Sequence, residues 1–267
     1  MTSRPGNPRR LPPPCPSWVW SSASDTQAAK DRCWFGDDYI PFKSYVTDIA
    51  GGWVEVIGMG TIILPTRGSP FQTGSHLNNF LRLKNVLHTP AMLCNIIGNT
   101  ILDDYTVIPT PSSPDISGVI VANYNGSSQA YFKHMGQGPM LYQVQIHQAP
   151  LGHELGISPL CSNGNYLIHA FWSQRERHRM EIFKDSGLTR ASGVEELTPI
   201  EKRWFGKQCM SEKGITFAYG LDYNRKEHRE EARAIMRILK SQAQNEPEFL
   251  SQENTPNTPN MPITLDY

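Results

Sequence analysis

The chain lacks a net charge, a long hydrophobic run and any pair of closely spaced cysteines. Its 267 residues carry 25 Lys and Arg against 25 Asp and Glu, so no global field attracts it to nucleic acid or to a membrane surface. No apolar run approaches the roughly 18 residues that a membrane span needs. The Pro- and Arg-rich N-terminus also has no hydrophobic stretch of the kind found in signal peptides. The length is sufficient for one large domain or two small ones.

The five cysteines are isolated from one another along the sequence. They are Cys15, Cys33, Cys94, Cys161 and Cys209. Because no two of them form a CxxC pair, neither a Cys-based zinc site nor a disulfide framework is expected. The sequence therefore predicts reduced thiols in an intracellular protein, with no metal and no cofactor.

Short apolar runs with strand character fill the chain from Trp18 to about Ile146. These runs cover residues 18–20, 53–57, 61–64, 80–87, 105–108, 119–122 and 141–146. In the last run Tyr142, Val144 and Ile146 alternate with two glutamines, which is the period of a half-buried strand. Clusters of Gly, Pro, Asn and Ser separate the runs. Many short strands with frequent turns predict an antiparallel barrel or sandwich.

The periodicity changes to helical spacing after about Asn165. A helix is expected over 166–183. A second begins at Thr198-Pro199-Ile200-Glu201, which combines a capping residue, a proline at the first helical position and a glutamate at the third. A third is expected over 224–242, with an apolar face opposite a charged one. Residues 244–267 hold four acids, four prolines and neither Lys nor Arg, which predicts a disordered tail.

These patterns divide the chain into five parts. They predict a disordered Pro/Arg-rich segment at 1–16, a β domain at 17–150, a linker at 151–164, a helical region at 165–243 and the disordered tail at 244–267. The predicted fold class is mainly β with an α-helical C-terminal appendage, that is, α+β.

The segment that begins at Trp18, WVWSSASDTQAAKDRCWF, resembles the start of the retropepsin-type protease domain of copia-type retrotransposon polyproteins. That family has a Trp, an aliphatic pair, Asp-Ser-Gly-Ala-Ser, a variable residue, a His and then Asp-Arg. Aligned without a gap between Trp18 and Asp31-Arg32, the chain has other residues at the family's signature positions. Ser21 falls at the aspartate, Ser22 at the serine, Ala23 at the glycine and Gln27 at the histidine.

Three further motifs follow in the family's order. Gly58-Met59-Gly60-Thr61 is similar to its Gly-x-Gly-Thr hairpin, and Leu83-Lys84-Asn85-Val86-Leu87-His88-Thr89-Pro90 to its Leu-x-Asn-Val-Leu-x-x-Pro strand. Asn95-Ile96-Ile97-Gly98 resembles the strand that lies behind the catalytic loop of retropepsins. The resemblance implies a retropepsin-like β-barrel, with the 96–98 strand buried beside the 21–24 loop.

The catalytic signature is degenerate in this alignment. Aspartic proteases need two carboxylates close enough to share one proton, and retropepsins bring them together by dimerising, one from each subunit. Ser21 supplies no acid, and Ala23 adds a methyl group where the loop must approach its copy closely. The resemblance therefore implies a non-catalytic domain. Its expected partners are a second copy of the chain, or a peptide or protein.

Two alternatives remain open at this point. A shifted register takes Asp25-Thr26-Gln27-Ala28 as the catalytic signature of an active homodimeric aspartic endopeptidase, although it places Gln27 at the loop glycine. The other is nucleic-acid binding through the C-terminal helices, where acids interleave with the basic residues and favour an ordinary solvated face instead. The basic residues there are Arg175, Arg177, Arg179, Lys202, Arg203, Arg225, Lys226, Arg229, Arg233 and Arg237.

Overall fold

The structure is a computed structural model, which describes residues 12–71, 78–110, 115–133, 141–161, 164, 166–187 and 189–252. The first 11 residues of the predicted N-terminal disordered segment and residues 253–267 of the predicted tail lie outside the described residues. Residues 12–16 of the N-terminal segment are described. There the Cys15 side chain is buried, and its backbone N–H donates to Asp31 Oδ2 over 2.8 Å.

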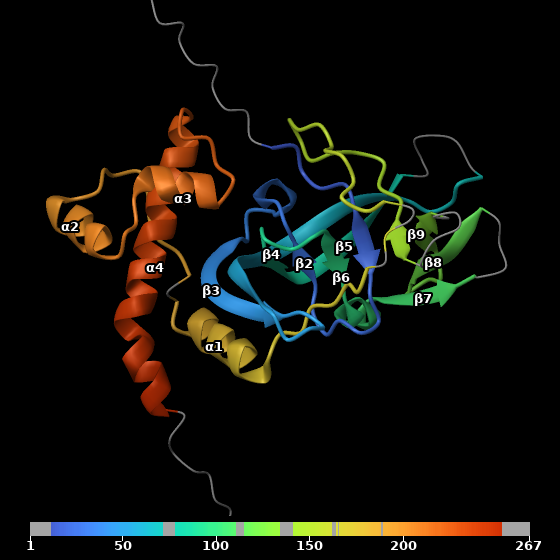
Figure 1. Cartoon of the computed structure of the whole chain (residues 1–267), viewed down its shortest axis with the longest axis horizontal. Helices are drawn as coiled ribbons and strands as arrows, with labels where there is room; N and C mark the ends of the chain where they lie inside the picture. Colours follow the sequence, from blue (N-terminus) through green and yellow to red (C-terminus); the bar gives the residue numbers. More distant parts are fainter. Residues whose placement is uncertain are drawn as a thin grey trace, which may run out of the picture.

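The strands of the described residues form one ten-stranded sheet in the order β3-β4-β5-β2-β6-β1-β10-β9-β8-β7 (Figure 1). They are β1 (Trp18–Trp20), β2 (Ala28–Ala29), β3 (Ile40–Thr47), β4 (Trp53–Arg67), β5 (Asn78–His88), β6 (Asn95–Ile97), β7 (Tyr105–Pro109), β8 (Ile116–Ala122), β9 (Ser128–Lys133) and β10 (Tyr142–Val144). Antiparallel pairs make up both ends of the sheet. Parallel pairs occur at its centre, between β1 and β6 and between β2 and β5.

The prediction of a mainly β fold with a helical C-terminal part is confirmed, but the sheet does not close into a barrel. β3 and β7 lie at opposite ends of the strand order and do not pair with each other. The sheet curls enough for a single bridge between Thr66 and Ile146. Helices pack on the β3 side of the sheet, where Gln242 Nε2 donates to the Pro41 carbonyl over 2.8 Å. A covered edge needs no further strand to pair with its backbone groups.

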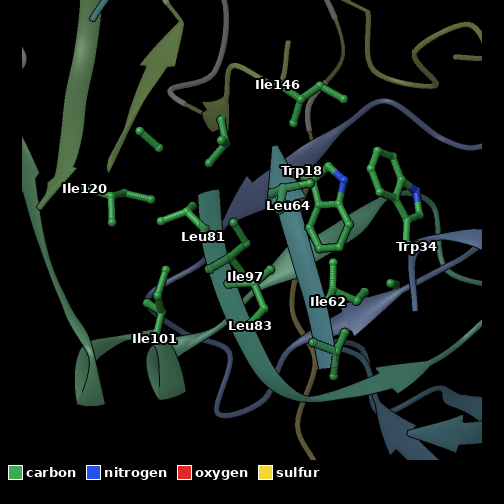
Figure 2. Packing of buried hydrophobic residues seen from close by; sticks show 14 of the residues in the cluster. Trp18, Trp34, Ile62, Leu64, Leu81, Leu83, Ile97, Ile101, Ile120 and Ile146 are labelled. Atoms are coloured by element: carbon green, nitrogen blue, oxygen red, sulfur yellow. The ribbon is translucent and has the colours of Figure 1, made fainter. Parts of the chain in front are cut away.

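The core lies inside the curled sheet and joins both of its ends (Figure 2). Trp18 of β1 is completely buried, and its ring meets that of Trp34 edge-on with centroids 5.6 Å apart. Ile97 of β6 packs in the same cluster, as do Leu64 and Ile120 from the two ends of the sheet. Burying side chains of this size contributes roughly 1.5–3 kcal/mol each. The sheet core thus fixes β1, which leads into the loop described below, and β6, which lies behind that loop.

Four α-helices follow the sheet among the described residues, and two short 3-10 helices interrupt it. The 3-10 helices are η1 (Arg32–Trp34) and η3 (Asn99–Asp103), and the α-helices are α1 (Gln174–Asp185), α2 (Pro199–Lys207), α3 (Glu212–Ala218) and α4 (Lys226–Gln252). In Figure 1, α1 lies beside β3, and α4 runs along the side of the molecule away from β7 and β8. None of these described helices is both long and apolar enough to cross a membrane.

The helix predictions are correct in part. The capping box at Thr198 is confirmed, since its side chain accepts from the Glu201 N–H while the Glu201 carboxylate accepts from the Thr198 N–H. The helix expected over 166–183 is wrong in its first half, because residues 166–173 are extended and the helix begins after the Ser173 cap. The last helix continues to Gln252, past the end expected at residue 242, so the prediction of a disordered tail is wrong for residues 244–252, which are helical.

A buried arginine, Arg233, fastens α4 to the segment that precedes α2. Arg233 is 3% exposed, and its Nε donates to the Gly193 carbonyl over 2.8 Å. The backbone approach is so close that a side chain at Gly193 would collide with the Glu230 carbonyl. The helical region is joined to the β domain by an ion pair between Arg32 and Glu231 at 2.7 Å.

Candidate functional site

The loop formed by residues 21–27 connects β1 to β2, and β6 lies between these two strands. β6 runs parallel to β1 and antiparallel to β2. The Ser21 N–H donates to the Ile97 carbonyl over 2.9 Å, and the Asn99 N–H donates to the Ser24 carbonyl over 2.8 Å. The Asn99 side-chain amide also donates to the Ser22 carbonyl over 2.6 Å. The prediction that the 96–98 segment is buried beside the 21–24 loop is therefore confirmed.

Gly98 is required where β6 passes behind the loop. A methyl group at this position would collide with the Thr26 carbonyl and lie 3.0 Å from the Ser24 carbonyl oxygen. Its φ is −93°, so the requirement comes from space and not from backbone conformation. The Ile-Ile-Gly motif thus has a local physical cause, the close approach of two backbone segments.

Ser21 stands at the start of the loop and has no acid–base partner in the described part of the chain. Its hydroxyl donates to the Ile168 carbonyl over 2.8 Å. A serine nucleophile needs a base such as a histidine within hydrogen-bond reach, and no described histidine bonds to this hydroxyl. Ser22 and Ala23 follow on the exposed side of the loop. The three residues at the degenerate signature hold no titratable group.

Asp25 is tied into a structural contact with the start of α1. Its Oδ1 accepts from the Trp172 N–H over 2.8 Å, and its Oδ2 lies 2.9 Å from Nη2 of Arg177. The same Arg177 nitrogen donates to the Asp25 carbonyl over 2.9 Å. Both carboxylate oxygens therefore have partners from the segment that follows the β domain. The sequence did not predict this contact.

Residues 168–172 lie as an extended segment between the loop and the end of β3. On the loop side, the Ala170 N–H donates to Ser24 Oγ over 3.0 Å and the Ala170 carbonyl accepts from the Asp25 N–H over 3.2 Å. On the other side is the hairpin of β3 and β4, where Phe171 and Thr47 exchange two backbone hydrogen bonds of 2.9 and 3.0 Å. Successive residues thus point their backbone groups to opposite sides, as in the middle strand of a sheet.

The side chains of this segment are sorted in the same way. Ala170 is completely buried and packs in a cluster with Ala28, Met92 and Ile96. Trp172 is buried, and its indole Nε1 donates to Ser44 Oγ over 2.9 Å. Phe171, between them, is 46% exposed. The space between the 21–25 loop and Thr47 is called the slot below, and residues 168–172 fill it.

A small cavity lies behind the loop, between β5, η3 and α1. Its volume is about 220 Å³, and its lining includes Thr26, Gln27, Arg82, Thr100 and Arg177. Gln27 is only 3% exposed, and its Oε1 has no hydrogen-bond partner among the described residues. An unpaired buried amide oxygen costs about 1–3 kcal/mol of folding free energy. The cavity wall thus offers an unused hydrogen-bond acceptor.

Thiol chemistry is unfavourable at Cys33, which is half-buried, and at Cys94, which is buried. Burial raises the pKa of both Cys33 and Cys94 to about 12. The nucleophilic thiolate is therefore scarce near neutral pH. Among the described residues no group of three His, Cys, Asp or Glu side chains is placed to hold a metal ion.

Acids within the chain compensate half of the basic residues that suggested nucleic-acid binding. Of the ten named from the sequence, all within the described ranges, five form ion pairs. These five are Arg177, Arg179, Lys226, Arg233 and Arg237. The bond from Arg237 lowers the pKa of Glu201 to about 2. Much of the positive charge is thus used to hold the helices together.

Comparisons of the chain with protein-family models, with curated proteins and with solved structures gave no match.

Proposed function

We propose that residues 17–150 form a non-catalytic retropepsin-like domain derived from a copia-type retrotransposon polyprotein. The support is the order of four sequence motifs together with the placement of two of them. The degenerate signature forms the loop between β1 and β2, and Asn95-Ile96-Ile97-Gly98 lies directly behind it. The proposal has two parts: the domain descends from a retrotransposon protease, and it has lost the peptidase activity.

One observation carries the loss of activity: Ser21, at the position of the family's aspartate, donates its hydroxyl to a backbone carbonyl. A carboxylate dyad works because like charges in close contact share one proton, one group acting as base on water and the other as acid on the carbonyl. A serine hydroxyl does not titrate in that range. The domain therefore acts through binding.

The alternative catalytic residue, Asp25, is poorly placed for this chemistry. Arg177 and the Trp172 N–H occupy its two oxygens. Activation of a water would require both contacts to break. In addition, the segment 168–172 contacts the loop at the Ser21 and Ser24 hydroxyls, so a second copy of the chain could meet these groups only if the segment moved. The same contacts thus disfavour the dyad in both registers.

A peptidase assay tests the proposal. The purified protein is incubated with a mixed peptide library at pH values from about 3 to 7, the range over which a carboxylate dyad holds its shared proton. We expect no cleavage above that of a buffer control. Cleavage that a statine-type transition-state mimic inhibits and that Asp25→Asn abolishes would refute the proposal and establish the endopeptidase instead.

A further inference from the structure

The segment 168–172 is bound in the slot as a separate peptide would be. It contacts the loop through the Ile168 carbonyl, both backbone groups of Ala170 and the Trp172 N–H. It contacts the hairpin through both backbone groups of Phe171. Strand addition of this type uses the main chain for affinity and the alternate side chains for specificity. The main-chain bonds of the slot therefore require an extended chain, and the alternate side chains select its sequence.

We propose that the slot is a binding site for an extended peptide, that segment 168–172 fills it as an internal ligand, and that a peptide of the same chemistry supplied in trans replaces it. The proposal goes beyond the proposed descent and does not depend on it. A peptidase assay can succeed or fail without any effect on peptide exchange.

The side-chain contacts define the class of peptide. The residue in the place of Ala170 must be small, because its methyl group is enclosed by Ala28, Met92 and Ile96. The residue two positions later must be tryptophan, because the indole Nε1 of Trp172 donates to Ser44 Oγ over 2.9 Å. The residue between them points outward, since Phe171 is 46% exposed. The ligand is thus an uncharged extended peptide with the pattern small, any residue, tryptophan.

The preceding chain gives the segment room to leave. Between β10 and the segment, the described residues of the range 147–167 form no helix and no strand. Leu151 and Ile157 are each 97% exposed, and Leu167 is 79% exposed. Leu160, in contrast, is buried with Cys15, Val19 and Cys94, and Ile168 packs against the same cluster, so release of the segment requires these contacts to break. Because the internal ligand is tethered, its effective concentration is of millimolar order, and a free peptide must compete with it.

A binding experiment on the full chain tests this proposal. The probe is a fluorescein-labelled peptide of residues 166–173, Tyr-Leu-Ile-His-Ala-Phe-Trp-Ser. Ala170→Glu expels the internal segment because a carboxylate does not fit the enclosed methyl site. Phe171→Glu is the matched control, since it adds the same charge at the neighbouring exposed position. We expect Ala170→Glu to bind the peptide at least about tenfold more tightly than the unaltered protein, by relief of the tethered competition. Phe171→Glu should behave as the unaltered protein.

Two further arms assign the binding to the slot. A peptide with Glu in place of its Ala should not bind, and Ser24→Ala added to Ala170→Glu should weaken binding, because it removes the acceptor for the backbone N–H. Ala170→Leu replaces Ala170→Glu if that chain does not fold, as judged by circular dichroism. The proposal is overturned if the folded variant binds the peptide no better than the unaltered protein, or binds both peptides equally. It is also overturned if size exclusion shows that the unaltered protein is a dimer and that the Ala170→Glu variant is a monomer, because the segment would then fill the slot of a second copy.

Discussion

Replacing Asp25 distinguishes a structural carboxylate from a catalytic one. Asp25→Ala removes the ion pair to Arg177, whose partners are 33% and 24% exposed, so solvent screening leaves about 0.5 kcal/mol for that pair. It also leaves the Trp172 N–H without its acceptor, which costs about 1–2 kcal/mol for a partly buried donor. The expected loss in the free energy of unfolding is therefore about 2 kcal/mol. Asp25→Asn keeps an oxygen for the Trp172 N–H and should lose only about 0.5–1 kcal/mol.

Urea unfolding followed by tryptophan fluorescence measures these changes. At about 2–4 °C per kcal/mol for a chain of this size, Asp25→Ala should also lower the Tm by about 5 °C. Asp37→Ala, which removes an exposed acid, is the control and should change neither quantity measurably. If Asp25→Ala unfolds at the same urea concentration as the unaltered protein, Asp25 does not hold the segment against the loop. The reasoning that the carboxylate is structurally engaged would then be wrong.

Two further predictions concern the backbone approach behind the loop and the acid stability of the core. Gly98→Ala should destabilise the protein by about 2–4 kcal/mol, because the new methyl group collides with the Thr26 carbonyl. The control, Gly206→Ala, lies in open space on α2 and should stabilise the protein by up to about 1 kcal/mol. Equal effects of the two substitutions in thermal melts would contradict this prediction. Burial lowers the pKa of His88 from 6.5 to about 3, so the unfolded chain binds a proton below pH 6.5 that the folded chain refuses until about pH 3. Stability should thus fall from pH 6.5 to 3, by at most about 4–5 kcal/mol from this group, and His88→Asn should flatten that dependence in urea titrations; an unchanged slope would refute it.

Local signals in the sequence predicted local structure well. The capping box at Thr198 is correct because its hydrogen bonds join residues three apart. The placement of Gly98 behind the loop followed from a motif whose chemistry is close packing. β3 was not predicted, since Pro41 interrupts the run, yet proline is tolerated on an edge strand and β3 is one. Short-range chemistry was therefore a sound guide to turns, caps and the loop.

The failures depend on contacts between distant parts of the chain. Residues 166–173 were assigned to a helix, but Ala170 and Phe171 exchange their backbone bonds with Ser24, Asp25 and Thr47, more than 100 residues earlier. The richness of 168–172 in Ile, Phe and Trp was the available signal for a strand. The open sheet was likewise not predicted, and the packing of a helix against β3 rests on contacts between distant residues, such as Gln242 with Pro41.

The central claim is that the chain's own segment 168–172 fills the slot and closes off the loop that carries Ser21. Amide hydrogen exchange, read residue by residue by NMR, tests it most directly. We expect the N–H groups of Ala170, Phe171 and Trp172 to exchange as slowly as those of β6, because each donates to a partner in the loop or the hairpin. Exchange as fast as that of the exposed Leu151 would show that the slot is open, and would contradict the claim.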